Sequence, residues 1–247
     1  MNKKEVSIII PLYNEEKRLP KFLPLILSGV RKYLLPKYPY EIIFVDDGST
    51  DKTREILSAD NKFKNNPRLK IVSYRDNHGK GYAVKKGVEK ACGRYIFFTD
   101  VDLSVDLSYL KKALIFLENG SDAVIASRRL PESRILIRQN KLRESLGHFY
   151  RNFTKTILSL KASDITCGFK GFRKKTAKKI FPLIKSRRWS FDAEILYLLK
   201  KLGCKVREIP VKWKNNSDTK VKLKRDIVFS FMEVLKIRFT CYNLSKP

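Results

Sequence analysis

Short runs of β-branched and aromatic residues alternate with longer amphipathic stretches through the first half of the chain. The apolar runs predict strands over residues 6–10, 42–45, 69–72, 95–98 and 123–126. Between them, the spacing of apolar positions predicts helices over 16–33, 51–58, 80–91 and 107–118. Four of the strands are apolar on both faces, as in a parallel sheet covered by helices. This alternation predicts an α/β fold built on a doubly wound, mostly parallel sheet.

The second half of the chain has a different pattern. Its apolar spacing predicts, in chain order, a long helix over 138–160, a helix over 191–202, short strands over 206–209 and 211–213, and an amphipathic helix over about 225–239. Gly203 is a fitting residue at the end of the second of these helices. We therefore expect a domain over residues 1–213, followed by a basic segment and an amphipathic C-terminal helix over 214–247.

The chain carries a large excess of basic residues, most of it in the second half. The 247 residues contain 53 Lys and Arg against 25 Asp and Glu, a formal net charge of +28. Residues 1–130 carry +8 of this charge and residues 131–247 carry +20. Such an excess favours a polyanionic partner, which can be a nucleic acid, an anionic membrane surface or a phosphorylated substrate. A basic nucleic-acid-binding protein is therefore the non-enzyme alternative.

Composition excludes other classes. The four cysteines are far apart and form no C-x-x-C pair, and His78 and His148 are the only histidines. Neither a zinc site nor a disulfide scaffold is indicated. No apolar run approaches the roughly 20 residues that span a bilayer. We expect a protein that is soluble or lies on the cytosolic face of a membrane.

Polar residues follow two of the predicted strands directly. Pro11, Tyr13 and Glu15 come after the first strand, and Asp46 and Asp47 come after the second. Ligands of doubly wound sheets bind beyond the carboxyl ends of the strands. A carboxylate there can accept a hydrogen bond from a nucleobase or a ribose. The competing interpretation is an acidic turn that caps the next helix.

The strand over 95–98 is followed by Asp100 and Asp102. An extended backbone points side chains at i and i+2 the same way. Mg²⁺ and Mn²⁺ prefer one or two carboxylates together with phosphate oxygens, so the pair fits a metal held against a nucleotide diphosphate. A solvated strand end is the competing interpretation. Lys80 lies between two glycines where a helix begins, a weak indication of a phosphate-binding turn that matches no Walker A spacing.

In their order along the chain, these segments resemble inverting family-two glycosyltransferases with the GT-A fold. The segments concerned are Ser7–Glu15, Val45–Asp51, Asn77–Gly81 and Asp100–Asp102. Further on, residues 164–172, 188–194 and 209–213 resemble dolichyl-phosphate β-glucosyltransferases, with dolichol-phosphate mannose synthases and bacterial polyprenyl-phosphate glycosyltransferases as close neighbours. Two positions depart from the pattern. Gly171 stands where the glucosyltransferases usually carry Leu, and Ser104 stands where mannose synthases offer an amide-bearing metal ligand.

The resemblance implies transfer of a hexose, with UDP-glucose as the first candidate donor, to dolichyl or polyprenyl phosphate with inversion. A mannose synthase or another polyprenyl-phosphate sugar transferase is the alternative. The resemblance assigns Pro11, Tyr13, Glu15, Asp47 and Lys80 to the nucleotide sugar, Asp100 and Asp102 to Mg²⁺ or Mn²⁺ on the diphosphate, Arg128 to the acceptor phosphate or the donor sugar, and Asp164 to the position of a proposed base. An orienting role for Asp164 is equally open, since a phosphate dianion needs little deprotonation.

A polyprenyl acceptor stays in its bilayer, so the resemblance and the basic second half together predict a peripheral enzyme on the cytosolic face of an anionic membrane. The long helix over 138–160 and the last helix are the expected contacts. Packing of the last helix on the sheet is the competing interpretation. We expect no nucleic-acid partner. A nucleotidyltransferase is disfavoured because its glycine-rich N-terminal signature is absent.

Overall fold

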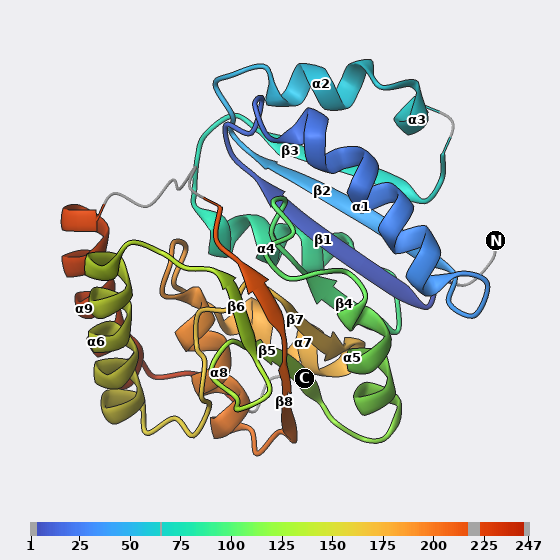
Figure 1. Ribbon diagram of the computed structural model, residues 1–247. Helices are drawn as coiled ribbons and strands as arrows, with labels where there is room; N and C mark the ends of the chain where they lie inside the picture. Colours follow the sequence, from blue (N-terminus) through green and yellow to red (C-terminus); the bar gives the residue numbers. More distant parts are fainter. Residues whose placement is uncertain (1–3, 65, 217–222, 245–247) are drawn as a thin grey trace.

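The computed structural model describes residues 4–64, 66–216 and 223–244, and its centre is a seven-stranded sheet (Figure 1). The strands of this sheet are β1 (Val6–Leu12), β2 (Tyr40–Asp47), β3 (Leu69–Tyr74), β4 (Tyr95–Phe98), β5 (Ala123–Ser127), β7 (Lys170–Arg173) and β8 (Val206–Pro210). Their order is β3-β2-β1-β4-β7-β5-β8. Neighbouring strands are parallel, except that β7 runs antiparallel to both β4 and β5. The predicted α/β, mostly parallel fold is confirmed.

Helices cover both faces of the sheet. One face is covered by α1 (Leu19–Leu34), α2 (Thr53–Ala59) and α5 (Tyr109–Glu118), and the other by α4 (Lys80–Lys90), α7 (Lys174–Ile180) and α8 (Phe191–Lys201). Two short helices, α3 (Asn61–Lys64) and a 3₁₀ helix (Phe181–Leu183), lie in the connections between these elements. Side chains of a strand alternate between the faces. Ile8 and Ile10 of β1 therefore lie in the core under α1, while Ile9 lies in the core under α4.

Two long helices, α6 (Lys141–Leu158) and α9 (Leu223–Phe239), lie side by side at one end of the molecule (Figure 1). The ring of Phe231 packs against three aromatic rings of α6, those of Phe149, Tyr150 and Phe153. Val234 and Ile237 of α9 are buried in the core beneath α8. Among the described residues, no helix combines the length and the apolarity that crossing a bilayer requires.

The strand β7 occupies a place in the sheet that the hydrophobic pattern did not predict, although a short strand-like segment is expected to begin within residues 164–170. It is a four-residue strand that inserts between β4 and β5, and its pairing depends on residues far apart in the sequence. A Cβ atom at Gly171 would lie 2.2 Å from the Phe97 ring, so the close approach of β7 to β4 requires glycine there. A small second sheet of β6 (Arg134–Ile137) and β9 (Lys212–Lys214) was also missed in part, since only β9 had been indicated.

The C-terminal segment set apart at 214–247 is described only in part. Residues 217–222 and 245–247 lie outside the described residues, and the division of the chain at residue 213 stays a prediction. The helix predicted over about 225–239 is present as α9.

Candidate functional site

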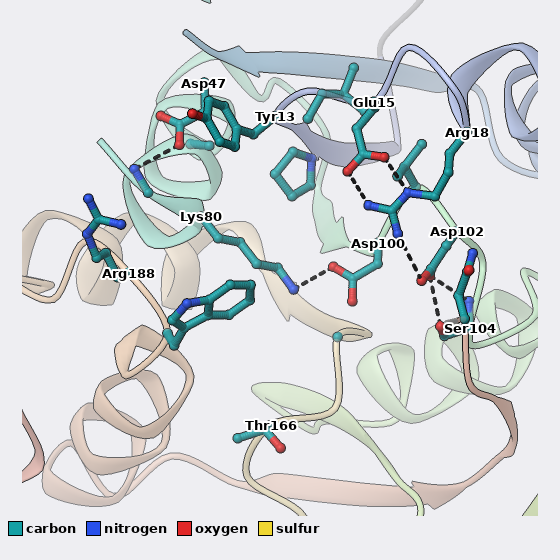
Figure 2. A pocket seen from close by; sticks show the side chains of 18 of the residues that line it. Tyr13, Glu15, Arg18, Asp47, Lys80, Asp100, Asp102, Ser104, Thr166 and Arg188 are labelled. Atoms are coloured by element: carbon teal, nitrogen blue, oxygen red, sulfur yellow. Dashed lines mark hydrogen bonds and ion pairs between the residues drawn. The ribbon is translucent and has the colours of Figure 1, made fainter. Parts of the chain in front are cut away.

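A cavity of about 720 Å³ opens at the carboxyl ends of β1, β2, β4 and β5 (Figure 2). Residues far apart in the sequence meet there because parallel strands end at one edge of the sheet. The sequence candidates that line it are Pro11, Tyr13, Glu15, Asp47, Lys80, Asp100, Asp102 and Arg128. Asp164 is buried and bonds to Arg128 at the cavity wall. The structure thus brings all the candidate residues together.

Asp100 and Asp102 stand just beyond β4, as the strand pattern predicted. Asp100 Oδ1 lies 2.5 Å from the ammonium of Lys80, which extends from the first residue of α4 (Figure 2). Asp102 Oδ1 accepts hydrogen bonds from the backbone N–H and the hydroxyl of Ser104, at 3.0 and 2.8 Å. Burial, and then the neighbouring charge of Asp100, raise the pKa of Asp102 above its usual range.

The guanidinium of Arg18 stands beside this pair. It is hydrogen-bonded to the carboxylate of Glu15, and one of its nitrogens lies 3.8 Å from Asp102 Oδ2. Glu15 is buried, so its charge requires a partner of this kind. Arg18 is not predicted from the sequence as a site residue, because a basic residue at the start of an amphipathic helix ordinarily faces solvent. The pairing arises only where α1 begins, beside the end of β4.

The donor set at Asp100 and Asp102 fits Mg²⁺ or Mn²⁺. Both side chains offer carboxylate oxygens, which are the ligands that these ions prefer. Within the described residues there is no cluster of three or more His, Cys, Asp or Glu side chains that could complete a protein-only site. A cation held here would take its remaining oxygens from water and from a ligand such as a diphosphate.

Asp47 is saturated with hydrogen bonds. Its two oxygens accept from the hydroxyl of Tyr74 (2.7 Å), the amide of Asn77 (2.8 Å) and the backbone N–H groups of His78 and Gly79 (3.0 and 2.7 Å). Burial raises the pKa of Asp47, although these donors oppose the shift. Asp47 therefore fixes the loop that leads into α4, where Gly79 has a φ of 100°.

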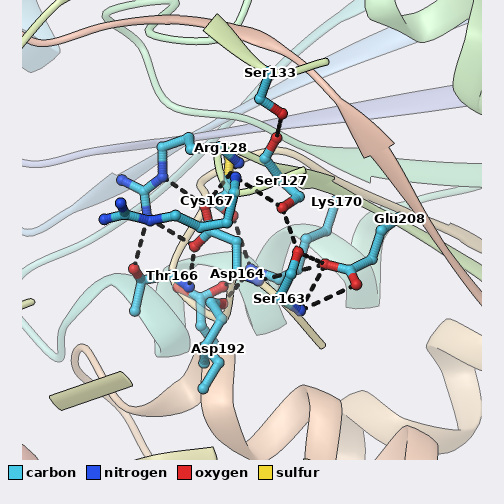
Figure 3. Close-up of polar contacts among 12 residues, drawn as sticks. Ser127, Arg128, Ser133, Ser163, Asp164, Thr166, Cys167, Lys170, Asp192 and Glu208 are labelled. Atoms are coloured by element: carbon cyan, nitrogen blue, oxygen red, sulfur yellow. Dashed lines mark hydrogen bonds and ion pairs between the residues drawn. The ribbon is translucent and has the colours of Figure 1, made fainter. Parts of the chain in front are cut away.

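A second wall of the cavity is built around the pair of Arg128 and Asp164 (Figure 3). The guanidinium donates to both oxygens of Asp164, at 2.6 and 2.8 Å, and to the hydroxyl of Thr166 at 2.9 Å. Its carbon lies 5.3 Å from the centre of the Trp213 ring. Although burial favours the neutral acid, the charge and hydrogen bonds of Arg128 hold the pKa of Asp164 at about 2.

Buried polar groups support this wall from behind. Glu208 accepts hydrogen bonds from the backbone N–H and the hydroxyl of Ser163, the residue before Asp164. The ammonium of Lys170, which is fully buried, donates to the carbonyls of Ile165 and Cys167 and forms an ion pair with Asp192. The loop that carries Asp164 is therefore held from both ends.

Further polar residues of the cavity had no sequence assignment. They are Arg18, Gln139, Arg143, Thr166, Arg188, Asn215 and Asn216. Burial and the charge of Arg128 lower the pKa of Arg143, which shows that two guanidinium groups share this wall. A periodic helix pattern cannot separate Arg143 from the solvated cations of the same helix.

Comparison with known proteins assigns the family. Residues 7–181 match the model of the glycosyl transferase family 2. The chain is 30% identical over 241 residues to the dolichyl-phosphate beta-glucosyltransferase of Dictyostelium discoideum, covering 95% of this chain and 74% of that protein. It is 34% identical over 217 residues to the enzyme of the same name from Drosophila melanogaster, covering 85% and 67%. The chain belongs to glycosyltransferase family 2.

Solved structures agree on the fold. A glucosyl-3-phosphoglycerate synthase from Mycobacterium tuberculosis, in complex with Mn²⁺, UDP and glucosyl-3-phosphoglycerate, superposes with a TM-score of 0.67 at 15% identity, covering 95% of this chain and 80% of that one. The TarS protein of S. aureus with UDP-GlcNAc gives 0.60 at 20% identity, covering 98% and 68%. The family and the fold together make this chain a glycosyltransferase with the GT-A architecture. The prediction of an enzyme is therefore confirmed, in preference to the alternative of a nucleic-acid-binding protein.

Proposed function

We propose that this glycosyltransferase moves glucose from UDP-glucose to dolichyl or polyprenyl phosphate with inversion, and that Mg²⁺ or Mn²⁺ supports the reaction. The names of the relatives support the acceptor and the sugar. The structural observation that carries the proposal is one cavity with a carboxylate pair, Asp100 and Asp102, at one wall and two arginines, Arg128 and Arg143, at the other. A donor diphosphate with its cation suits the first wall, and an acceptor phosphate suits the second.

The acceptor needs orientation more than deprotonation. A phosphate monoester has a second pKa of about 6 and is largely a dianion at pH 7. One of its oxygens attacks the anomeric carbon while the bond from that carbon to the diphosphate breaks, and UDP leaves with the bonding electrons. Arg128, fixed by Asp164 and Thr166, would hold the attacking phosphate in position. In this role Asp164 orients Arg128 and takes no proton.

The leaving diphosphate gains negative charge as the bond breaks. The ammonium of Lys80, the first residue of α4, lies at the carboxylate pair, where it can stabilise that charge. A divalent cation bound by Asp100 and Asp102 would act there as a Lewis acid. Asp47 contributes by holding the loop before α4, which we place at the nucleoside with Pro11 and Tyr13.

The test is a transfer assay with a panel of donors. The purified protein is incubated with Mg²⁺, dolichyl phosphate and labelled UDP-glucose, UDP-GlcNAc or GDP-mannose, and label is measured in the lipid extract. We expect label from UDP-glucose, none with dolichol in place of dolichyl phosphate, and none with Asp102→Ala. Label from GDP-mannose alone would correct the sugar and the nucleotide. No lipid-linked label from any donor would refute the acceptor.

We also propose that the enzyme works on the surface of an anionic membrane. Exposed apolar side chains gather on β6, α6 and α9, namely Leu136, Ile137, Leu142, Phe149, Phe229, Met232, Leu235 and Phe239. Both interpretations of α9 find support, since Val234 and Ile237 pack inward while Leu235 and Phe239 face solvent. The helix α6 also carries basic residues such as Lys141, Arg143, Arg151 and Lys155, and a helix that combines exposed apolar and basic side chains is typical of those that lie on anionic lipid.

Co-sedimentation with anionic liposomes tests this surface. We expect the protein to pellet at low salt and to be released at high salt, because each Lys or Arg near the surface contributes about 1 kcal/mol that salt screens. The double variant Leu142→Glu, Phe149→Glu should stay in the supernatant. The matched control is Leu25→Glu, Ile115→Glu, which changes exposed apolar residues of α1 and α5 (51% and 52% exposed, against 62% and 64% for Leu142 and Phe149) and should pellet normally. Loss of binding in the control alone would place the contact elsewhere.

A further inference from the structure

The two oxygens of the Asp100 carboxylate have different surroundings. A Cβ atom added at Gly168 would lie 2.0 Å from Oδ2, so the backbone of the loop after Asp164 packs directly on that oxygen. The other oxygen, Oδ1, is the one that lies 2.5 Å from the Lys80 ammonium, and both residues line the cavity. A cation that approaches Oδ1 from the cavity therefore meets the Lys80 ammonium.

Lys80 differs from the other cation of this wall. Arg18 is committed to Glu15 through hydrogen bonds and approaches Asp102 only to 3.8 Å. Lys80 instead forms an ion pair with Asp100, at the end of a long stem that extends from α4 into the cavity (Figure 2). Rotation of that stem can move the charge without disturbing the helix. Lys80 can therefore leave Asp100 for another anion, whereas Arg18 is held by Glu15.

We propose that Lys80 competes with the divalent cation for Oδ1 of Asp100, so that the cation binds together with the nucleotide diphosphate and not before it. The inference rests on the proposed metal-dependent function and adds an order of binding to it. In the free protein the ammonium neutralises Asp100, and a second cation on the same oxygen is repelled. A diphosphate at the N-terminus of α4 offers Lys80 other oxygens, and Asp100 is then released to the metal.

This exchange predicts thermodynamic coupling. If the diphosphate raises the affinity for the cation, the cation must raise the affinity for the diphosphate by the same factor. Removing the Lys80 ammonium should abolish most of this coupling, because the affinity for the divalent cation in the absence of nucleotide should rise. That affinity is the informative quantity, because loss of a contact between Lys80 and the diphosphate cannot raise it.

The experiment measures Mn²⁺ binding by the EPR signal of the free ion, first without nucleotide and then with saturating UDP. The variant is Lys80→Met, which keeps most of the stem and removes the charge. Arg188→Met is the matched control, since Arg188 lines the same cavity but lies away from Asp100 (Figure 2). Lys86→Met, whose wild-type side chain pairs with Glu89 on the outer face of α4, controls for net charge.

We expect wild-type protein to bind Mn²⁺ weakly alone and at least about tenfold more tightly with UDP, a typical coupling between sites. Lys80→Met should bind Mn²⁺ alone about tenfold more tightly than wild type, and both controls should stay within about twofold of wild type. If Lys80→Met binds Mn²⁺ alone no more tightly than the controls, while wild type still binds Mn²⁺ with UDP, the role of Lys80 is overturned and the metal site stands. If wild type binds no Mn²⁺ even with UDP, the metal-dependent function fails, and this inference fails with it.

Discussion

Asp102 and Asp164 are aspartates of one site whose pKa values shift in opposite directions. The pKa of Asp102 is raised by burial and by the charge of Asp100, and its hydrogen bonds come from the neutral groups of Ser104. The pKa of Asp164 is held at about 2 by a guanidinium that binds both of its oxygens. Burial alone would raise the pKa of both, so the difference comes from the partner that the protein supplies.

The difference separates a wall that lines the cavity with carboxylates from a wall that lines it with a guanidinium. At Asp100 and Asp102 the neighbouring cations are Lys80, 2.5 Å from Asp100, and Arg18, 3.8 Å from Asp102, and in the proposed function a metal bound with a diphosphate would take the place of Lys80. At the second wall the carboxylate of Asp164 is paired with Arg128, and it is Arg128 that lines the cavity and can contact a ligand. The predictions below test whether the two walls serve the donor and the acceptor separately.

The largest effect is expected at the first wall. Asp102→Ala should lower kcat by about 10³-fold or more, because charge stabilisation of the leaving group is among the largest contributions to such reactions. The melting temperature should change little, since the side chain is only partly buried and its hydrogen bonds come from the neighbouring residue Ser104. Steady-state kinetics and thermal unfolding measure both. Normal turnover in Mg²⁺ would contradict the assignment of this wall to the metal.

At the second wall, Arg128→Met should reduce both activity and stability. The substitution leaves Asp164 buried without its cation, and breaking a buried pair in this way costs about 3–5 kcal/mol, toward the low end here because Arg128 is 17% exposed. Denaturant unfolding at pH 7 measures the loss, and the acceptor KM should rise by more than tenfold. An unchanged acceptor KM would contradict the placement of the phosphate.

The same variant has a predicted pH dependence. The folded pKa of Asp164, about 2, lies below the ordinary value of about 3.9, so the pair stabilises the fold fully above about pH 4. That contribution is lost as the pH falls from about 4 to 2. The stability difference between wild type and Arg128→Met should therefore shrink over this range. A difference that stays constant down to pH 2 would show that packing, and not the ion pair, accounts for it.

The two walls also differ in what the sequence reveals. Asp100 and Asp102 follow a strongly apolar strand, so local pattern alone placed them at the edge of the sheet. Arg128 likewise follows β5. The pairing of Arg128 with Asp164 is invisible to such a pattern, because it joins a strand end to a loop after a long helix. The buried Lys170 is hidden for the same reason, since a lysine in a short strand normally indicates an exposed edge.

A smaller effect is expected for Asp47, which holds the loop before α4. Asp47→Ala should raise the donor KM by about tenfold or more with little change in kcat, because it removes three hydrogen bonds that hold the loop before α4 and a fourth from Tyr74 of β3. Donor-saturation kinetics measure the split. The acceptor KM serves as the internal control and should not move, and a large fall in kcat with an unchanged donor KM would contradict the role of the loop.

The smallest effect is expected for Asp164→Asn, where the two walls are compared most directly. If Asp164 orients Arg128, the amide oxygen keeps one of the contacts, and kcat/KM for the acceptor should fall by only about threefold to tenfold. Loss of a general base would instead cost about 10²–10⁴-fold. In both the wild type and Asp164→Asn, the rate should decline below about pH 6, where the acceptor phosphate loses its second negative charge. A loss of 10²-fold or more in kcat, with Arg128 still in place by crystallography, would make Asp164 the base and give the second wall a proton-transfer role.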